Sequence, residues 1–356
     1  MEKIGLLTIH DTLNFGSLLQ TMALYKAVEG LGCDITLIDY KNAAISRRES
    51  TYRLRDCRKP KDVCKAIFHH GFLERKRRCF WKFIGENMGV TRPFYGETIG
   101  ESNELFDTFL VGSDMVWGMN ITNFDFHYML DFLDMDKKKI AFSSSVGERW
   151  PDRCDEKIGS LLKSFDFLSV REQLSAGWIA GLIGREVSTT CDPTMLWEEG
   201  FWMKYNDRKL APEGNYILAY FRTDNKSTVR DAAAYGRKKN LPVYYINYNH
   251  AEPDVKNIRP ESVEEWISLF VNADTIFTAS YHGLLFSLYF NRPFFWYNRA
   301  NKARMESLSR ELGIEEREGT QRNILRDIPV DFHRINGMIA QKREESWNLL
   351  KAALLS

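Results

Sequence analysis

Short apolar runs alternate with longer stripes of helical spacing along the 356 residues of the chain. The first run, residues 4–9, is followed by a helical stripe over 18–30 and by a second short run at 34–39. Further buried strands are predicted at 108–111, 139–144 and 167–170. Strands that alternate with helices predict parallel sheets joined by crossover helices.

A cluster of turn signals divides the chain near its middle. Asp192-Pro193 and Ala211-Pro212 interrupt the alternation in the way that a domain boundary does. The second series has predicted strands at 216–221, 243–246, 275–278 and 294–297, and predicted helices at 226–239, 263–271, 283–290 and 330–355. We therefore expect an α/β protein with two Rossmann-like lobes, residues 1–205 and 206–356. The second lobe ends in the long helix, and a ligand is expected in a cleft between the lobes.

The composition is that of an ordinary globular protein. It is 44% hydrophobic and 27% charged with a net charge of +1, which gives no reason to expect a nucleic-acid partner. Six scattered cysteines lack zinc-site spacing and predict reduced thiols with no bound metal. The N-terminus enters a strand directly, without the long apolar region of a signal peptide. These features favour a cytoplasmic location.

One segment departs from this balance. Residues 47–82 contain 13 Lys and Arg side chains and 4 acidic ones, a net charge of +9. Because helices are predicted around 61–70 and 72–86, we interpret residues 47–86 as a basic helical insertion in the first lobe. Two interpretations remain open: a solvated charged face, or a surface that contacts anionic phospholipids at the inner face of the membrane or a lipid-diphosphate-linked substrate.

Polar side chains gather where the predicted strands end, which is where ligands bind in open parallel sheets. These positions are His10 to Gly16, Ser113-Asp114, Ser144-Ser145, Arg171, Arg222 and Ser280 to Gly283. The turn Ser280-Tyr281-His282-Gly283 opens a predicted helix, whose first N–H groups and dipole favour an anion. Gly283 permits close approach, and the imidazole of His282 is a side chain that can donate or accept a proton. The turn therefore predicts an anion-binding or proton-handling site.

Several stretches, taken together and in order, resemble the polysaccharide pyruvyl transferase family. They are "NFGSLLQTMALYKAVEGLG" (14–32), "FLVGSDMVWG" (109–118), "AFSSSVGE" (141–148), "LSVREQ" (168–173), "CDPTMLW" (191–197) and "SVEEWISLFVNADTIFTASYHGLLFSLYFNRPF" (262–294). Met115 and Gly118 stand where the family usually has Gln and Asn, and some members carry Arg in place of Ser280. The resemblance covers most of the chain apart from the basic insertion and the tail.

The resemblance implies a fold like that of the two-lobed GT-B glycosyltransferases. It also implies transfer of the enolpyruvyl unit of phosphoenolpyruvate, the donor substrate, to two sugar hydroxyls as a pyruvate ketal, with no cofactor or metal. The first lobe would hold the acceptor and the second the donor. Ketal formation needs a general acid and a general base, and donor binding needs cations. The candidate general acid is His282, and the candidate general base is Asp114. The candidates for binding phosphoenolpyruvate are Arg222, Ser280, Tyr281, His282 and Gly283. The candidates for binding a lipid-linked or nucleotide-linked acceptor are Asn14, Gly16, Gln20 and Ser145.

Alternatives remain at this stage. The same scaffold suits a glycosyltransferase that uses a nucleotide sugar, and it suits a catalytically silent glycan-binding or scaffold protein. Single residues have structural alternatives as well: His282 or Asp114 as a cap, and Arg222 as the partner of Asp224. We interpret Arg171-Glu172 as a buried pair that fastens strand to helix, and Asp192-Pro193 as a boundary turn.

Overall fold

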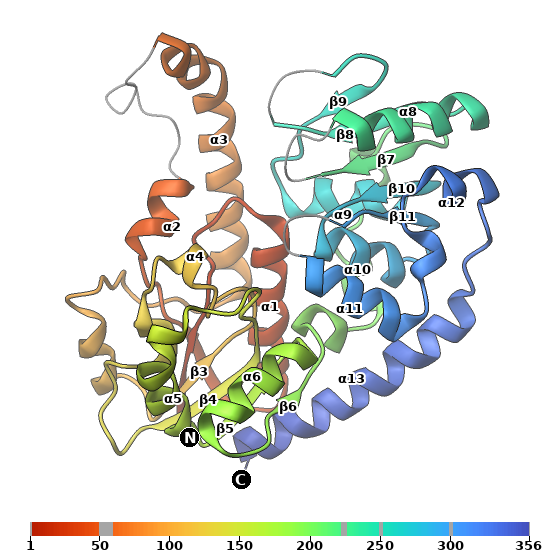
Figure 1. Cartoon of the computed structure of the whole chain (residues 1–356). Helices are drawn as coiled ribbons and strands as arrows, with labels where there is room; N and C mark the ends of the chain where they lie inside the picture. The colour runs from red at the N-terminus through yellow and green to blue at the C-terminus, as the bar shows by residue number, and fades with distance from the viewer. Residues whose placement is uncertain (1, 50–59, 222–225, 249–251, 299–301, 356) are drawn as a thin grey trace. The chain divides into compact units, whose positions relative to one another are not determined.

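The computed structural model describes the chain except for residues 1, 50–59, 222–225, 249–251, 299–301 and 356. The predicted donor clamp Arg222 lies outside the described residues. The chain divides into two compact units (Figure 1). Unit 1 comprises Met1–Thr51, Phe80–Leu196 and Gln341–Ser356, and unit 2 comprises Tyr52–Cys79 and Trp197–Ala340.

This division differs from the predicted one at 205/206. The chain passes from unit 1 to unit 2 at Leu196, and its last residues belong to unit 1. Hydrogen bonds fix the tail there, because the Trp347 indole donates to the Leu196 carbonyl at 3.0 Å and the Ser346 hydroxyl accepts from the Cys191 amide at 2.9 Å. The long C-terminal helix α13 (Phe332–Leu355) therefore contributes residues to both units.

Unit 1 is built on a six-stranded parallel sheet with the order β2-β1-β3-β4-β5-β6. Its strands are β1 (Lys3–Leu7), β2 (Asp34–Leu37), β3 (Thr108–Val111), β4 (Lys138–Ser144), β5 (Phe167–Val170) and β6 (Ser188–Thr189). Its helices are α1 (Phe15–Gly30), α2 (Ala43–Arg48), α4 (Met119–Thr122), α5 (Asp155–Lys163) and α6 (Gln173–Ile183). Its 3-10 helices are η2 (Ile99–Glu104), η3 (Phe126–Met129), η4 (Asp152–Cys154) and η5 (Pro193–Leu196). The central strands β1, β3 and β5 are mostly buried and mostly apolar, as expected for a parallel sheet covered on both faces, whereas the edge strands β2 and β6 are partly exposed.

Unit 2 is built on a five-stranded parallel sheet with the order β11-β10-β7-β8-β9. Its strands are β7 (Ile217–Tyr220), β8 (Val243–Ile246), β9 (Lys256–Ile258), β10 (Thr275–Thr278) and β11 (Phe294–Trp296). Its helices are α7 (Glu199–Met203), α8 (Lys226–Lys239), α9 (Val263–Val271), α10 (Tyr281–Tyr289), α11 (Lys302–Leu312) and α12 (Gln321–Arg326), with 3-10 helices η6 (Arg208–Leu210) and η7 (Glu315–Arg317). The Phe286 ring of α10 packs edge-on against Trp202 and Trp266, which holds α10 in the core.

The basic segment forms one helix, α3 (Pro60–Asn87), where two were predicted. Its residues up to Cys79 group with unit 2, not with the first lobe as predicted, and two of its cations contact other residues of that unit. The Lys76 ammonium is buried 4.0 Å from the centre of the Tyr248 ring, and the Arg75 guanidinium forms two-pronged hydrogen bonds with the Glu261 carboxylate. Lys76 is therefore not part of a solvated face, whereas Arg75 forms its ion pair at the surface, with 53% of its side chain exposed.

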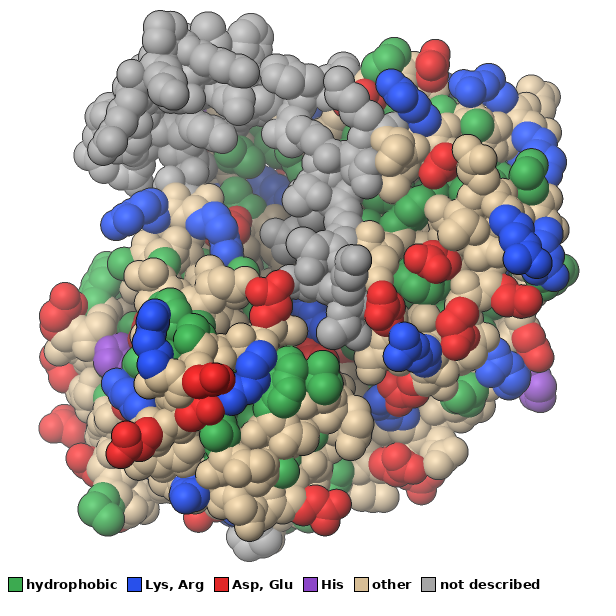
Figure 2. All heavy atoms as spheres, in the orientation of Figure 1, with side chains coloured by type: hydrophobic (Ala, Val, Ile, Leu, Met, Phe, Trp, Pro, Cys, Tyr) green, Lys and Arg blue, Asp and Glu red, His purple; other side chains and the backbone are tan. Residues whose placement is uncertain are grey.

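Among the described side chains on the face shown in Figure 2, basic and acidic groups are interspersed. Of the helices that the structure describes, none combines the length and hydropathy that a bilayer span requires.

Candidate functional site

Each sheet reverses its strand order at one point, and this switch point is where ligands bind in doubly wound folds. In unit 1 the switch lies between β1 and β3, and in unit 2 between β7 and β10. The strand ends meet there: the Thr8 hydroxyl donates to the Ser113 carbonyl at 2.9 Å, and the Thr278 hydroxyl donates to the Tyr220 carbonyl at 2.9 Å. Both predicted catalytic residues, Asp114 and His282, follow strands of these pairs.

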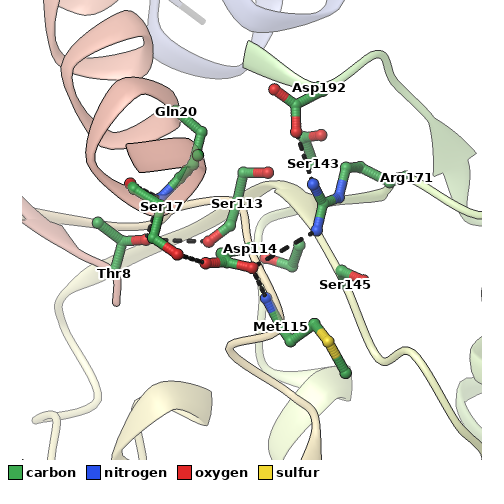
Figure 3. A network of polar contacts seen from close by, with 12 residues as sticks. Thr8, Ser17, Gln20, Ser113, Asp114, Met115, Ser143, Ser145, Arg171 and Asp192 are labelled. Atoms are coloured by element: carbon green, nitrogen blue, oxygen red, sulfur yellow. Dashed lines mark hydrogen bonds and ion pairs between the residues drawn. The ribbon is translucent and has the colours of Figure 1, made fainter. Parts of the chain in front are cut away.

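Asp114 follows β3 with a left-handed backbone, at a φ of 69°. This conformation is uncommon for a residue other than glycine, although Asp tolerates it better than most, and it occurs at functional sites as well as in turns. One carboxylate oxygen accepts a short hydrogen bond from Ser17 of α1, and the other accepts from the Met115 amide at 2.8 Å (Figure 3). The Asp114 side chain is 14% exposed, so these contacts orient a carboxylate that solvent still reaches.

The N-terminus of α1 supports this carboxylate. Asn14 caps the helix, accepting from the Gly16 amide and donating to the Ser17 hydroxyl at 2.7 Å. Gln20 is fully buried, and its NH₂ group donates to the Thr8 hydroxyl and the Ser17 carbonyl. Gln20 thus lies behind the site, where a sugar cannot contact it in this structure.

Ser145, the other predicted acceptor contact in this unit, is also fully buried. Its hydroxyl donates to the Glu172 carboxylate, and its amide donates to the Asp114 carbonyl at 3.0 Å. Ser145 therefore supports the Asp114 loop from within, instead of facing an acceptor. Of the four predicted acceptor residues, Asn14 and Gly16 lie at the N-terminus of α1.

The ion pair at the end of β5 differs from the predicted one. Arg171 pairs with Asp192 at 2.5 Å, while Glu172 accepts hydrogen bonds from the Ser145 and Ser175 hydroxyls. Asp192 also accepts from the amide and hydroxyl of Thr194, so the predicted turn is present and carries a charge as well. The sequence carried no signal for this pair, because Asp192 follows β6, a strand of two residues that the sequence did not predict.

A second polar cluster lies beyond β1 and β2. The buried His10 ring lies 2.9 Å from the Asp39 carboxylate, and the Lys41 ammonium lies 2.8 Å from Asp39 and 3.0 Å from Asp11. Burial alone raises the pKa of Asp39, but the hydrogen bonds and charges of His10 and Lys41 outweigh it and hold that pKa below its usual value. His10, with a fully buried side chain, is part of this internal cluster.

In unit 2 the predicted turn opens α10 as expected. The Ser280 hydroxyl caps the helix by accepting from the Gly283 amide at 3.3 Å, and the Ser280 amide donates to the Thr278 hydroxyl at 3.0 Å. Tyr281 and His282 fill the first turn, with ring centres 5.6 Å apart. His282 is 6% exposed, so its imidazole has only a small surface open to a ligand in this structure.

Residues 14–301 match the family model described as polysaccharide pyruvyl transferase. The chain belongs to this family. Among curated proteins, no match to the chain was found.

Solved structures share the fold of this polysaccharide pyruvyl transferase family member at low identity. One is UDP-GlcNAc 2-epimerase from Neisseria meningitidis bound to UDP-GlcNAc, with 9% identity, a TM-score of 0.51 and 100% of both chains covered. Another is a candidate UDP-N-acetylglucosamine 2-epimerase from Listeria monocytogenes, with 10% identity, a TM-score of 0.51, and 97% of this chain and 90% of that chain covered. These likenesses show a GT-B fold and nothing about the ligand.

The two switch points of this pyruvyl transferase family member differ in charge. At the N-terminus of α1 the Asp114 carboxylate already accepts from the first turn, so a second anion would be repelled there. The first turn of α10 contains no acidic residue and carries His282. A helix N-terminus of this kind favours an anion. Among the described residues, no group of three or more His, Cys, Asp or Glu side chains is placed to hold a metal ion.

Proposed function

We propose that this protein transfers the enolpyruvyl unit of phosphoenolpyruvate to a sugar of a surface polysaccharide precursor and forms a pyruvate ketal. The observation that carries this proposal is the difference between the two switch points: a carboxylate lies at one, and a helix N-terminus without an acidic residue lies at the other. Phosphoenolpyruvate bears a carboxylate and a phosphate, which suit the N-terminus of α10 beside His282. A neutral sugar hydroxyl that must lose a proton suits the Asp114 carboxylate at the N-terminus of α1.

The reaction requires two C–O bonds to form at C2 of the donor. Protonation of C3 by His282 converts the methylene to a methyl group and leaves an oxocarbenium-like C2. A first sugar hydroxyl attacks C2 and gives its proton to Asp114. A second hydroxyl then forms the other C–O bond as the bond to phosphate breaks, and its proton leaves with the phosphate. The sum is phosphoenolpyruvate plus a sugar diol giving a cyclic ketal plus phosphate.

Donor binding in this proposal rests on the first turn of α10. Ser280, Tyr281 and Gly283 would contribute hydroxyl and amide donors, and His282 would add a charge-assisted hydrogen bond. Arg222 stays a predicted clamp for the donor. The acceptor would be lipid-linked or nucleotide-linked, and the exposed cations of α3 would bring the protein to an anionic membrane surface.

The test is phosphate release from phosphoenolpyruvate with a panel of lipid-linked and nucleotide-linked sugars. His282→Ala should abolish release while the far-UV circular dichroism spectrum stays unchanged. The matched control is His333→Ala, which removes an exposed imidazole from α13 in the same unit and should leave turnover unchanged. Normal turnover by His282→Ala would refute the proposed role.

Thermal-shift measurements separate the alternatives, because a ligand that binds only the native state raises the melting temperature. Stabilisation by phosphoenolpyruvate supports the proposal. Stabilisation by uridine or cytidine diphosphate, without phosphoenolpyruvate, would indicate a nucleotide-sugar glycosyltransferase instead. No shift with either donor, together with binding of a glycan, would indicate a binding protein.

A further inference from the structure

A buried guanidinium lies behind Asp114. The Arg171 side chain is 2% exposed and follows β5, while Asp192 is fully buried beyond β6. One terminal nitrogen of Arg171 lies 2.5 Å from an Asp192 oxygen, and the other lies 4.0 Å from an oxygen of Asp114. Figure 3 shows Arg171 between the two carboxylates, with Asp192 on one side and Asp114 on the other. The Arg171 cation therefore lies close to two carboxylates, the fully buried Asp192 and the partly exposed Asp114.

Stability alone is a poor explanation for this arrangement. Burying an ion pair costs desolvation, and apolar residues of similar volume often stabilise a core as well or better. A cation within about 4–6 Å of a carboxylate, in contrast, favours its ionised form strongly. The buried pair thus delivers a fixed positive charge to Asp114, the group at the switch point of unit 1.

The orientation of this cation is fixed from behind. One Asp192 oxygen accepts hydrogen bonds from the amide and hydroxyl of Thr194, at 3.0 and 2.6 Å, which leaves the other oxygen directed at Arg171. The Asp114 loop is fixed as well, because its carbonyl accepts from the Ser145 amide at 3.0 Å. These hydrogen bonds therefore limit how far the Arg171 guanidinium and the Asp114 carboxylate can move apart.

We propose that Arg171, held by Asp192, is a positioning residue that keeps the Asp114 carboxylate ionised and directed toward the end of β3. This inference rests on the proposed function, because it supplies the electrostatic support that Asp114 needs as a proton acceptor. The competing explanation is a purely structural tie between the ends of β5 and β6. A structural tie affects stability but leaves the pH dependence of the reaction unchanged.

The experiment is the pH profile of phosphate release, measured as kcat and kcat/KM between pH 4.5 and 9. Removing Arg171 alone would leave Asp192 as an unpaired buried charge and endanger folding. The main variant is therefore the double substitution Arg171→Met with Asp192→Asn, which removes both charges, and Arg171→Lys keeps the cation. The control is Glu172→Gln, which neutralises the adjacent buried carboxylate that hydrogen-bonds Ser145 and Ser175.

In the double variant the acid limb of the kcat/KM profile should move up by about one pH unit. Its kcat should fall roughly tenfold to a hundredfold. Arg171→Lys should keep the acid limb within a few tenths of a pH unit of the wild-type position, and Glu172→Gln should not move it. An unchanged acid limb in a folded double variant would overturn the proposal.

A second measurement does not depend on turnover. Asp114 can be titrated by ¹³C NMR of aspartate-labelled protein, with its signal assigned by its absence in Asp114→Asn. Its titration midpoint should rise by about one pH unit in the double variant. If the wild-type protein releases no phosphate with any acceptor, the proposed function fails while this midpoint still decides the role of Arg171. An unmoved midpoint refutes that role whatever the activity.

Discussion

Replacing Gly283 by alanine should destabilise the protein, although alanine normally stabilises a helix relative to glycine. A Cβ at this position in α10 would lie 2.3 Å from the Thr278 hydroxyl oxygen and 3.0 Å from the Tyr220 ring. Non-bonded contacts of this kind are normally about 3.5–4.0 Å. The first turn of α10 therefore packs so closely against the ends of β7 and β10 that any side chain at position 283 collides with them.

The Thr278 hydroxyl cannot move aside to relieve this collision. It donates to the Tyr220 carbonyl at 2.9 Å and accepts from the Ser280 amide at 3.0 Å, and a β-branched side chain has few other rotamers. The start of α10 must shift instead. Against the gain of about 0.5–1 kcal/mol from replacing a helical glycine stands an overpacking cost of about 1–3 kcal/mol. We expect a net loss of about 1–2 kcal/mol.

The assay is urea unfolding. An unchanged m-value would show that the substitution changes stability and not the surface exposed on unfolding. The control is Gly337→Ala in α13 of the same unit, where no atom lies within 4 Å of the added Cβ, and it should stabilise by about 0.5–1 kcal/mol. In a double-mutant cycle, Thr278→Ala should reduce the cost of Gly283→Ala, because it removes the obstructing oxygen. The argument for close packing fails if Gly283→Ala matches the control.

Three further outcomes follow from unit 1 and from α9. The hydrogen bond to Asp131 raises the pKa of His127 against the effect of burial, so His127→Gln should lower the urea midpoint most below pH 6.5, with the difference shrinking as pH rises through the folded-state pKa. Asp39, next to His10, has a lowered pKa and contributes stability above pH about 4, so the cost of Asp39→Asn should shrink as pH falls through its folded-state pKa in the same titration. Ser262 forms a capping box at the start of α9, so Ser262→Ala should cost about 1 kcal/mol in urea unfolding.

The central strands were predictable because parallel strands buried on both faces appear as short apolar runs between turn residues. The predicted strands 108–111, 167–170, 243–246 and 275–278 are confirmed at both ends. The strands not predicted, β6 and β9, are edge strands of two and three residues, too short for a periodic signal. The predicted division at 205/206 placed all later residues in the second lobe, whereas the structure groups the last residues with unit 1. Local turn chemistry carries no information on where those last residues pack.

The strand-end rule also placed Asp114 and the Ser280 to Gly283 turn just beyond strand ends, as they are in the structure. The rule did not show which charged side chains form ion pairs. Arg171 and Glu172 are adjacent in sequence, and successive side chains at a strand end point to opposite faces. The partner of Arg171 comes from the neighbouring strand, because Val170 lies opposite Thr189 in the parallel register and Asp192 follows shortly after. Pairing across strands requires the sheet order, which the sequence alone does not supply.

Strained backbone occurs at two positions on the same edge of the unit 1 sheet. Asp114 after β3 and Ser143 at the end of β4 both have left-handed backbones, at φ values of 69° and 56°. Each costs of order 1–3 kcal/mol and persists only where its surroundings hold it. Ser143 is held on both sides: its hydroxyl donates to the Cys191 carbonyl at 2.7 Å, and its amide donates to the Ser169 hydroxyl at 3.0 Å.

The register of β4 with β5 shifts between Ala141 and Ser144, and beyond this irregularity the Ser145 amide reaches the Asp114 carbonyl. Both strained residues therefore have buried hydrogen-bond partners: Ser145 for the Asp114 carbonyl, and Ser169 and Cys191 for Ser143. Packing alone does not require two strained residues on adjacent strands of a marginally stable protein. The proposed role of Asp114 would account for them, because a proton acceptor must keep one orientation at the end of β3, and local rules of this kind are often broken at functional sites.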